Sequence, residues 1–179
     1  MLTLAQIGSE AKDGHHVVKS YPSGAEVVTA TMEHAVRLAP MMRKLDKFEC
    51  MAMGSTPIEA LTYGLHMDDV TLTVLSKEGN PIAMFGVGHP KHDTSERPRG
   101  YIWLLGSEDI KRYGYEFMRD SKKFAKMLIQ PYSVLENYVY AHYDEAVKWL
   151  MFLGADIVTK KDISGLPFYK FRFKNPNLN

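Results

Sequence analysis

The sequence contains a single cysteine, Cys50, so the chain cannot form an internal disulfide bond. Cys50 is surrounded by Phe48, Met51 and Met53, which predicts a buried thiol in a reducing compartment. The chain also lacks an apolar run of about eighteen residues, and no charged segment followed by a hydrophobic one comes after Met1. We therefore expect neither a membrane span nor a secretion signal.

The sequence also has no large excess of positive or negative charge. Lysine and arginine total 22 against 21 aspartate and glutamate, which leaves a formal net charge of +1. Such a balance gives no large electrostatic footprint for DNA or RNA, so nucleic-acid binding is not predicted. The sequence also shows no internal repeat and no low-complexity tract.

What is present suits one compact domain. The chain has 179 residues, of which 45% are hydrophobic and 24% charged, enough to bury a substantial core. We divide it into an N-terminal arm over residues 1–22, a domain over residues 23–174 and a short disordered tail over residues 175–179. The arm is expected to add an edge strand or to dock on a partner.

The most informative stretch runs from residue 100 to residue 156. A continuous apolar run over residues 101–105, bounded by glycines, predicts a central strand. The basic pair Lys111 and Arg112 then precedes Gly114 at the start of a long amphipathic helix, where free N–H groups favour a phosphate. We expect a strand over residues 133–141.

A second helix of this half is expected to start with Asp144 as its cap and to end at Gly154, which easily takes the left-handed conformation. Two further strands are expected to close the chain.

The N-terminal half predicts a similar alternation. A strand is expected over residues 26–31, then a helical region over residues 31–50 that Pro40 interrupts, because proline lacks the N–H of an interior turn. The segment from Thr56 to Glu59 forms a capping box at the start of another helix. Two strands joined by a glycine-containing hairpin are expected at residues 70–75 and 81–87. The predicted order is β-α-α-β-β-β-α-β-α-β-β.

This order, with the loop before Gly114 and the segment 144–155, resembles the GNAT (acyl-CoA N-acyltransferase) superfamily over nearly the whole chain. The resemblance implies an α/β fold of the α+β type, a single domain with a central mixed, mostly antiparallel sheet flanked by helices. It implies acetyl-CoA as the candidate cofactor and a binding segment made of six residues: Leu104, Leu105, Gly106, Lys111, Arg112 and Gly114.

Three positions depart from the pattern of the superfamily. The acyl-CoA loop usually ends in glycine or alanine, and Glu116 stands there. Many GNAT enzymes carry an asparagine before the last helix and, within it, a tyrosine that protonates the leaving thiolate, and those positions are Tyr143 and Leu150. Because leucine cannot donate a proton, the nearest candidates for a general acid are Tyr143, Tyr140 and His142.

On the expected acceptor side, Glu49 is a candidate to receive the proton of an amine, with Arg43 and Asp46 at helical spacings of three. An exposed ladder of ion pairs on a helix is the more common interpretation of this spacing. The pair Lys111 and Arg112 either contacts phosphate or is a solvated part of the loop.

Other polar and aromatic positions are open to two interpretations. His89, His92 and Asp93 suggest a metal, but no further ligand has a recognisable spacing, so a polar loop is favoured and no metal site is predicted. Trp103 packs either on a ligand or, more commonly, in the core. Asn137 contacts a ligand or, more commonly, caps a strand edge.

A narrower resemblance is carried by five short strings. They are similar to the gene-thirteen internal virion protein family of short-tailed podophages (autographiviruses), whose members are themselves GNAT-like. Membership implies a role in virion assembly or the internal core, phage virion or assembly proteins as partners, and a place in the host cytoplasm or the virion. The five strings lie at residues 42–49, 83–87, 103–107, 117–121 and 135–139.

Two hypotheses from different classes follow. In the first, the chain is a structural or chaperoning part of phage assembly with degenerate acyltransferase chemistry. In the second, it is an active acetyl-CoA-dependent N-acetyltransferase that acts on an unidentified amine acceptor.

Overall fold

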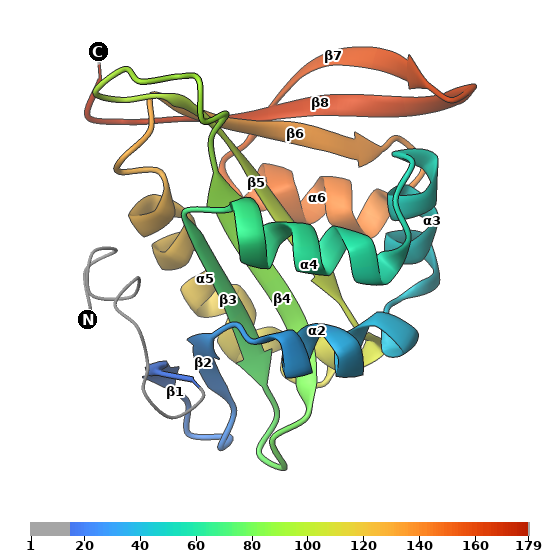
Figure 1. Cartoon of the computed structure of the whole chain (residues 1–179), viewed down its shortest axis with the longest axis vertical. Helices are drawn as coiled ribbons and strands as arrows, with labels where there is room; N and C mark the ends of the chain where they lie inside the picture. The colour runs from blue at the N-terminus through green and yellow to red at the C-terminus, as the bar shows by residue number, and fades with distance from the viewer. Residues whose placement is uncertain (1–14, 179) are drawn as a thin grey trace.

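The computed structural model describes residues 15–178, apart from the side chains at positions 114, 115, 117 and 118. Residues 1–14 of the predicted arm and Asn179 of the predicted tail lie outside the described residues. The described elements form one sheet with helices packed on both of its faces (Figure 1). The strands are β1 (Val17–Ser20), β2 (Glu26–Thr29), β3 (Val70–Leu75), β4 (Pro81–Gly88), β5 (Arg99–Gly106), β6 (Val134–Tyr140), β7 (Asp156–Ile163) and β8 (Leu166–Lys174).

The helices follow the predicted order along the chain. Pro40 lies in a short 3₁₀ turn, η1, that separates the first two helices, as its missing N–H predicted. The helical elements are α2 (Met32–Leu38), η1 (Ala39–Met41), α3 (Lys44–Ala52), α4 (Pro57–Met67), η2 (Glu108–Lys111), α5 (Gly114–Leu128) and α6 (Asp144–Leu153).

The eight strands have the order β1-β2-β3-β4-β5-β6-β8-β7. Every neighbouring pair is antiparallel except β5 and β6, so the sheet is mixed and mostly antiparallel, as predicted. Strand β1 pairs with β2 and lies in the predicted N-terminal arm, which therefore supplies an edge strand. The predicted fold class is confirmed. The structure adds β1 in front of the predicted order and divides the first predicted helical region into α2 and α3.

Side chains on the two faces of the sheet form two separate cores. On one face, α2 and α4 cover a cluster that includes Leu38, Leu61 and Met84 (Figure 1). On the other face, α5 and α6 cover a larger cluster with Phe124 and Leu150. Strand β4 contributes to both clusters and is buried along its whole length, because helices lie over both of its faces.

Local sequence signals explain several element ends. The Thr56 side chain accepts a hydrogen bond from the Glu59 N–H while the Glu59 carboxylate accepts one from the Thr56 N–H, which confirms the capping box of α4. Gly79 in the β3–β4 turn has φ +74°, and Gly154 after α6 has φ +97°. Both glycines therefore supply the left-handed backbone that was predicted for them.

The structure differs from the prediction at two places. Asp144 is the first residue of α6 and not its cap, since Tyr143 occupies the cap position without a side-chain hydrogen bond. Asn175, the first residue of the predicted disordered tail, is 2% exposed, and its Nδ2 atom donates to the carbonyl oxygen of Tyr132 at 2.8 Å. Asn175 fixes the start of the tail because its amide satisfies carbonyl groups at the end of the α5–β6 connection.

Candidate active site

The parallel strands β5 and β6 separate from each other after three pairs of residues. Arg99, Gly100 and Tyr101 pair with the first three residues of β6, and the register ends there. Beyond that point β5 stays with β4 as far as Gly106, while β6 stays with β8 as far as Tyr140. The sheet therefore opens as a wedge between its two halves.

Two side-chain features fix the point at which the wedge begins. A Cβ atom on Gly100 would lie 2.7 Å from side-chain atoms of Leu135 and Tyr132, so only glycine allows β5 and β6 to approach so closely there. Asn137 donates from Nδ2 to the carbonyl oxygen of Ile102 at 3.0 Å. Asn137 thus caps the edge of the strand, which confirms the favoured interpretation.

A cavity of about 660 Å³ occupies the wedge. This volume is in the range that small-molecule and cofactor sites use. Helix α3 borders the cavity on one side, and α6 with the β5–α5 connection borders it on the other. The residues that line it are Arg43, Asp46, Glu49, Met53, Ile102, Trp103, Leu104, Leu105, Ile110, Lys111, Asn137, Tyr138, Val139, Tyr143, Glu145, Ala146, Lys148, Trp149, Leu150, Phe152 and Phe171.

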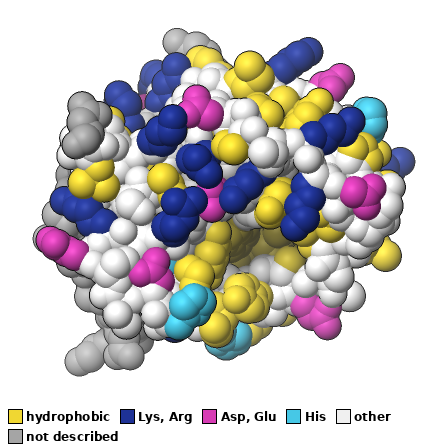
Figure 2. All heavy atoms as spheres, turned by 90° about the horizontal axis from the view of Figure 1, so that it is seen from above, with side chains coloured by type: hydrophobic (Ala, Val, Ile, Leu, Met, Phe, Trp, Pro, Cys, Tyr) yellow, Lys and Arg dark blue, Asp and Glu magenta, His cyan; other side chains and the backbone are white. Residues whose placement is uncertain are grey.

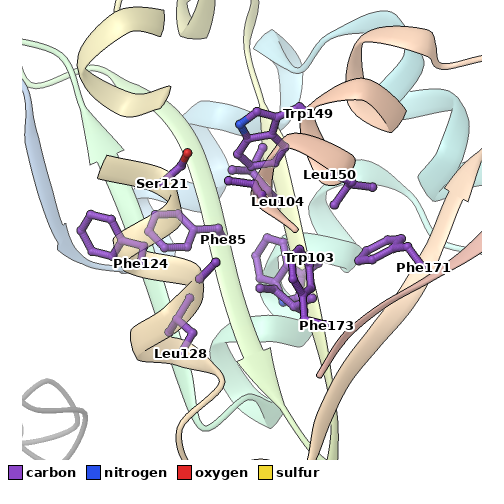
Figure 3. A pocket seen from close by; sticks show the side chains of 13 residues that line it. Phe85, Trp103, Leu104, Ser121, Phe124, Leu128, Trp149, Leu150, Phe171 and Phe173 are labelled. Carbon is purple, nitrogen blue, oxygen red and sulfur yellow. The ribbon is translucent and has the colours of Figure 1, made fainter. Parts of the chain in front are cut away.

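A small apolar pocket of about 60 Å³ continues from this cavity toward α5. Figure 3 shows Leu104 of β5 and Trp149 of α6 at this pocket, with Phe124 and Leu128 of α5 on its far side. Leu104, Trp149 and Leu150 line both spaces. The cavity is therefore apolar where it enters the core between α5 and α6.

The edge of β5 that faces the wedge carries backbone polar groups. Ile102 directs its carbonyl oxygen there, since it accepts from Asn137, and Gly106 directs its N–H to Asp46 at 2.7 Å. Because groups of alternate residues point to the same edge, the N–H and C=O of Leu104 point there too. Among the described strands, β6 is the neighbour on this side, and its pairing ends at Glu136.

Helix α3 places a buried carboxylate beside this edge. Asp46 is 1% exposed and binds the Arg43 guanidinium, with Nη2 at 2.9 Å from Oδ2. Burial raises the pKa of Asp46, while Arg43, the Gly106 N–H and the Tyr143 hydroxyl act to lower it. The interpretation of these residues as an exposed ladder of ion pairs is therefore wrong, because the Asp46 end of α3 packs against the wedge.

Glu49 lies one helical turn further along α3 and also lines the cavity. Its Oε1 atom accepts a hydrogen bond from the Tyr140 N–H at 2.5 Å. Burial raises the pKa of Glu49 to about 7, and the nearby Asp46 charge acts in the same direction. A carboxyl group with this pKa can accept a proton near neutral pH.

The two other predicted catalytic candidates are placed differently from each other. Tyr143 lines the cavity and is buried, with the Arg43 guanidinium 5.5 Å from its ring centroid. Burial, followed by the Asp46 charge, raises its pKa, so the hydroxyl keeps its proton. His142 is exposed, its ring contacts Tyr140, and it is not among the residues that line the cavity.

The predicted phosphate loop is divided between two surfaces. Lys111 lines the cavity and pairs with Glu108 at 3.1 Å and with Glu145 at 3.6 Å. Arg112 instead lines a separate depression with Lys77 and Tyr113. The structure therefore brings only Lys111 of the basic pair to the cavity.

Gly114 and Glu116 occupy the first turn of α5. The Glu116 carboxylate accepts a hydrogen bond from the Ser23 hydroxyl, and both residues line the depression that contains Arg112. The Glu116 side chain therefore faces this depression and not the cavity.

Trp103 packs against the core under α2 and α4, which confirms the more common of its two interpretations. Its indole Nε1 donates to Asp68 at 2.6 Å, and its ring packs over Gly64 of α4, where a Cβ atom would lie 2.4 Å away. Trp103 also lines the cavity.

The loop with His89, His92 and Asp93 is held by polar contacts. His89 Nδ1 lies 2.6 Å from Asp69, and Asp93 accepts from the Arg99 N–H at 3.0 Å. Within residues 15–178, no three His, Cys, Asp or Glu side chains are grouped so that they could hold a metal ion. The helices of the same range include none that is long and apolar enough to cross a membrane.

Sequence reasoning did not identify Lys148 or Trp149 as cavity residues. Trp149 belongs to the predicted apolar face of α6, and only the separation of β5 from β6 exposes that face to a cavity. The available signal was the alternation of apolar and charged residues along α6, which predicts a buried face but not what it borders.

The architecture is shared with solved acetyltransferases. A GCN5-related N-acetyltransferase from Kribbella flavida superposes with a TM-score of 0.62 at 11% identity, over 86% of this chain and 99% of that one. A GNAT-family acetyltransferase from Bacillus anthracis superposes with a TM-score of 0.64 at 9% identity, over 89% and 99%. A ribosomal-protein-S5-alanine acetyltransferase from Vibrio fischeri gives 0.53 at 13% identity, over 93% and 100%. The chain therefore has the GNAT fold.

No family model matches the sequence, and no curated protein matches it. At these low identities the solved structures show the fold alone. The comparisons give no support to the predicted resemblance to internal virion proteins of podophages.

Proposed function

We propose that this chain is an acyl-CoA-dependent N-acyltransferase. One observation carries the proposal: the wedge between β5 and β6 holds a cavity with a raised-pKa carboxyl group, Glu49, on one side and the Lys111 loop before α5 on the other. The GNAT fold of the chain and the acetyltransferase function of the solved structures support this assignment.

The residues of the cavity fit acetyl-CoA. The N–H and C=O of Leu104 at the open edge of β5 can hydrogen-bond the amide groups of the pantetheine arm, as a neighbouring strand would. Trp149 and Leu150 supply an apolar wall for the same arm. Lys111, Lys148 and the N-terminal turn of α5 favour the phosphates.

Two predicted cofactor contacts are replaced. The Gly106 N–H is already bound to Asp46, and Arg112 lies at the separate depression. We therefore assign the phosphates to Lys111 and the first turn of α5, and the pantetheine arm to Leu104 and its neighbours. Leu105 lines the cavity and also packs against the core under α2 and α4.

Bound acetyl-CoA would supply an acyl group activated as a thioester. Glu49 accepts the proton of the acceptor amine as the new N–C bond forms and the C–S bond breaks. Tyr140 holds Glu49 through its N–H, which leaves the second carboxylate oxygen able to take that proton. Most of the acceleration is assigned to holding the amine against the thioester in the cavity.

The leaving thiolate does not need a tyrosine at position 150. A thiol ionises near pH 8.5, so its thiolate is a good leaving group that water can protonate afterwards. The Tyr143 hydroxyl donates a hydrogen bond to Asp46, and the Arg43 guanidinium lies over the Tyr143 ring. We therefore assign Tyr143 to the positioning of Asp46 and Arg43, and not to proton transfer.

The test is a calorimetric titration of the purified protein with acetyl-CoA. We expect binding that weakens about tenfold in Lys111→Gln and is unchanged in Lys126→Gln, a change of the same charge on the exposed last turn of α5, far from the cavity. Gly114→Trp should abolish binding while a thermal melt shows a folded protein. No binding at millimolar acetyl-CoA would refute the proposal.

If the protein does not bind acetyl-CoA, a structural role in phage assembly becomes the leading hypothesis. That role, with virion or assembly proteins as partners, rests on the five short strings alone. A mapped gene neighbourhood would test it independently of any activity.

A further inference from the structure

Strand β6 divides the surroundings of the cavity into two sides. Its residues 135 and 139 face the core under α5 and α6, while Glu136, Tyr138 and Tyr140 alternate with them and face the side of α3. The ring of Tyr140 lies 4.9 Å from that of Phe48 on α3, which places Glu49 on this second side as well. The second side is therefore where an acceptor would approach Glu49.

Four cations gather on the acceptor side of the sheet. Glu136 pairs with Arg99 of β5 at 2.9 Å, with Lys170 of β8 at 3.0 Å and with Arg172 of β8 at 3.1 Å. Lys161 of β7 lies over the ring of Tyr138, 5.4 Å from its centroid. We refer to Arg99, Lys161, Lys170 and Arg172 as the cationic strip.

The cationic strip is not neutralised by its own carboxylate. One glutamate is shared by three of the cations, and Lys161 contacts an aromatic ring and not an acid. Partial burial acts to raise the pKa of Glu136, but hydrogen bonds from Lys170, Arg99 and Arg172 lower it to about 2. Glu136 therefore keeps its negative charge at neutral pH, and the four cations outnumber this one carboxylate.

Figure 2 views the face formed by the β6, β8 and β7 end of the sheet. It shows Lys and Arg side chains gathered beside a hollow whose floor is hydrophobic. Tyr138, which contacts Lys161, lines the cavity of the wedge. The positive surface and the cavity therefore meet at Tyr138.

The spacing along β6 gives the dimensions of a matching ligand. Tyr140 contacts Glu49, Tyr138 lies two residues away, and Glu136 lies four residues away. At roughly 3.3 Å per residue, the cationic strip begins roughly 7 Å from the position of the proton acceptor and reaches roughly 13 Å.

We propose that the acceptor is an amine that carries a carboxylate or phosphate roughly 7 to 13 Å from its reacting nitrogen, held by Arg99, Lys161, Lys170 and Arg172. This proposal rests on the proposed acyltransferase function, because that function is what places the reacting amine at Glu49. The cationic strip would hold the anionic group of such a ligand whether or not cofactor is present.

The experiment measures the binding of probes by fluorescence anisotropy in low salt. One pair is the labelled peptide Ala-Asp-Glu-Glu and its neutral match Ala-Asn-Gln-Gln, both with a free amino terminus. The second pair is 6-aminohexanoate and its amide, used as competitors of the labelled peptide. Comparison of the two pairs distinguishes an acidic peptide from a small amino acid as the source of the anionic group.

We expect the acidic peptide to bind about tenfold more tightly than its neutral match, with a difference that shrinks as salt is raised. Lys170→Gln and the exposed Lys161→Gln should each weaken acidic binding, whereas Lys126→Gln on α5 should not. Glu136→Gln should strengthen it, because a competing carboxylate is removed. A purely structural role of the cluster would not produce this increase.

Equal binding of the acidic and neutral probes, or equal losses in Lys170→Gln and Lys126→Gln, would overturn the inference. The outcome is separate from that of the cofactor titration. Acetyl-CoA binding without acidic preference refutes this inference alone, and acidic preference without acetyl-CoA binding refutes the acyltransferase assignment alone.

Discussion

Glu49 of α3 and Tyr140 of β6 are joined by a hydrogen bond of 2.5 Å from the Tyr140 N–H to Oε1, although 91 positions separate them in the chain. The bond links helix α3, on the acceptor side, to strand β6, which diverges from β5 beyond Glu136. It holds a carboxyl group of raised pKa at the wall of the cavity.

The first prediction concerns catalysis by Glu49. Glu49→Gln keeps the shape and the contact with Tyr140 but cannot accept a proton, so we expect kcat to fall about 100-fold or more. Acetyl-CoA binding should be unchanged. Steady-state rates with an amine found by an acceptor screen, together with calorimetry, check both; equal rates would remove Glu49 from the reaction.

The second prediction concerns pH and activity. Glu49 must be ionised to act as a base, so kcat/KM should rise as the pH passes through about 7, the pKa of this group, and level off above it. In Glu49→Gln this rise should disappear. A rise of the same midpoint in both proteins would assign it to another group.

The third prediction concerns pH and stability. The folded-state pKa of Glu49 is raised from 4.5 to about 7, so the folded protein holds this proton more tightly than the unfolded chain. The contribution of Glu49 to the free energy of unfolding therefore falls as the pH rises from about 4.5 to about 7, by roughly 2 to 3 kcal/mol.

The matching measurement is urea unfolding of the wild-type protein and Glu49→Gln at pH 4.5 and pH 8. We expect the variant to gain stability relative to the wild type only at pH 8. A difference that is the same at both pH values would mean that Glu49 has an ordinary pKa in the folded protein.

The fourth prediction concerns the buried pair of Asp46 and Arg43. Asp46→Asn removes the partner charge of a guanidinium whose side chain is 14% exposed, and it weakens the contact with the Gly106 N–H. We expect the free energy of unfolding to fall by about 3 kcal/mol. As a control, Glu33→Gln breaks the exposed pair with Arg37 and should change stability by less than about 0.5 kcal/mol. Similar effects of the two changes would contradict the burial of Asp46.

The fifth prediction concerns the vertex of the wedge. In Gly100→Ala the added methyl group would meet Leu135 and Tyr132 at 2.7 Å, which should destabilise the fold by about 1 to 3 kcal/mol and push β5 from β6. The nearest atom to a Cβ atom on Gly106 is 3.3 Å away, so Gly106→Ala should cost less. Chemical denaturation of both variants makes the comparison.

Most of the fold prediction was based on local sequence signals. The capping box at Thr56, the interruption at Pro40 and the glycine at position 154 each act within a few residues, so they can be recognised without knowledge of the tertiary structure. The end at Asn175 was not predicted, because its amide is satisfied by carbonyl groups more than forty positions away.

The site was predictable only in part. Glu49, Tyr143 and Lys111 were identified and line the cavity, whereas His142 and Arg112 were identified and lie elsewhere. The side chains of adjacent residues point in different directions in a helical turn. The pattern of residue types therefore does not show which of the two adjacent cations, Lys111 or Arg112, faces the cavity.

The sequence by itself determined the fold class and the order of the elements from β2 onwards, because hydrophobic periodicity and caps are short-range properties of the chain. Only the tertiary structure decided that Asp46 is buried, that Glu49 lines the cavity, and that Tyr140 contacts Glu49. It also decided that four cations from β5, β7 and β8 lie beside Glu136 and Tyr138. The pKa of a carboxyl group and the charge of a surface depend on groups from distant segments, and these come together only when the sheet forms.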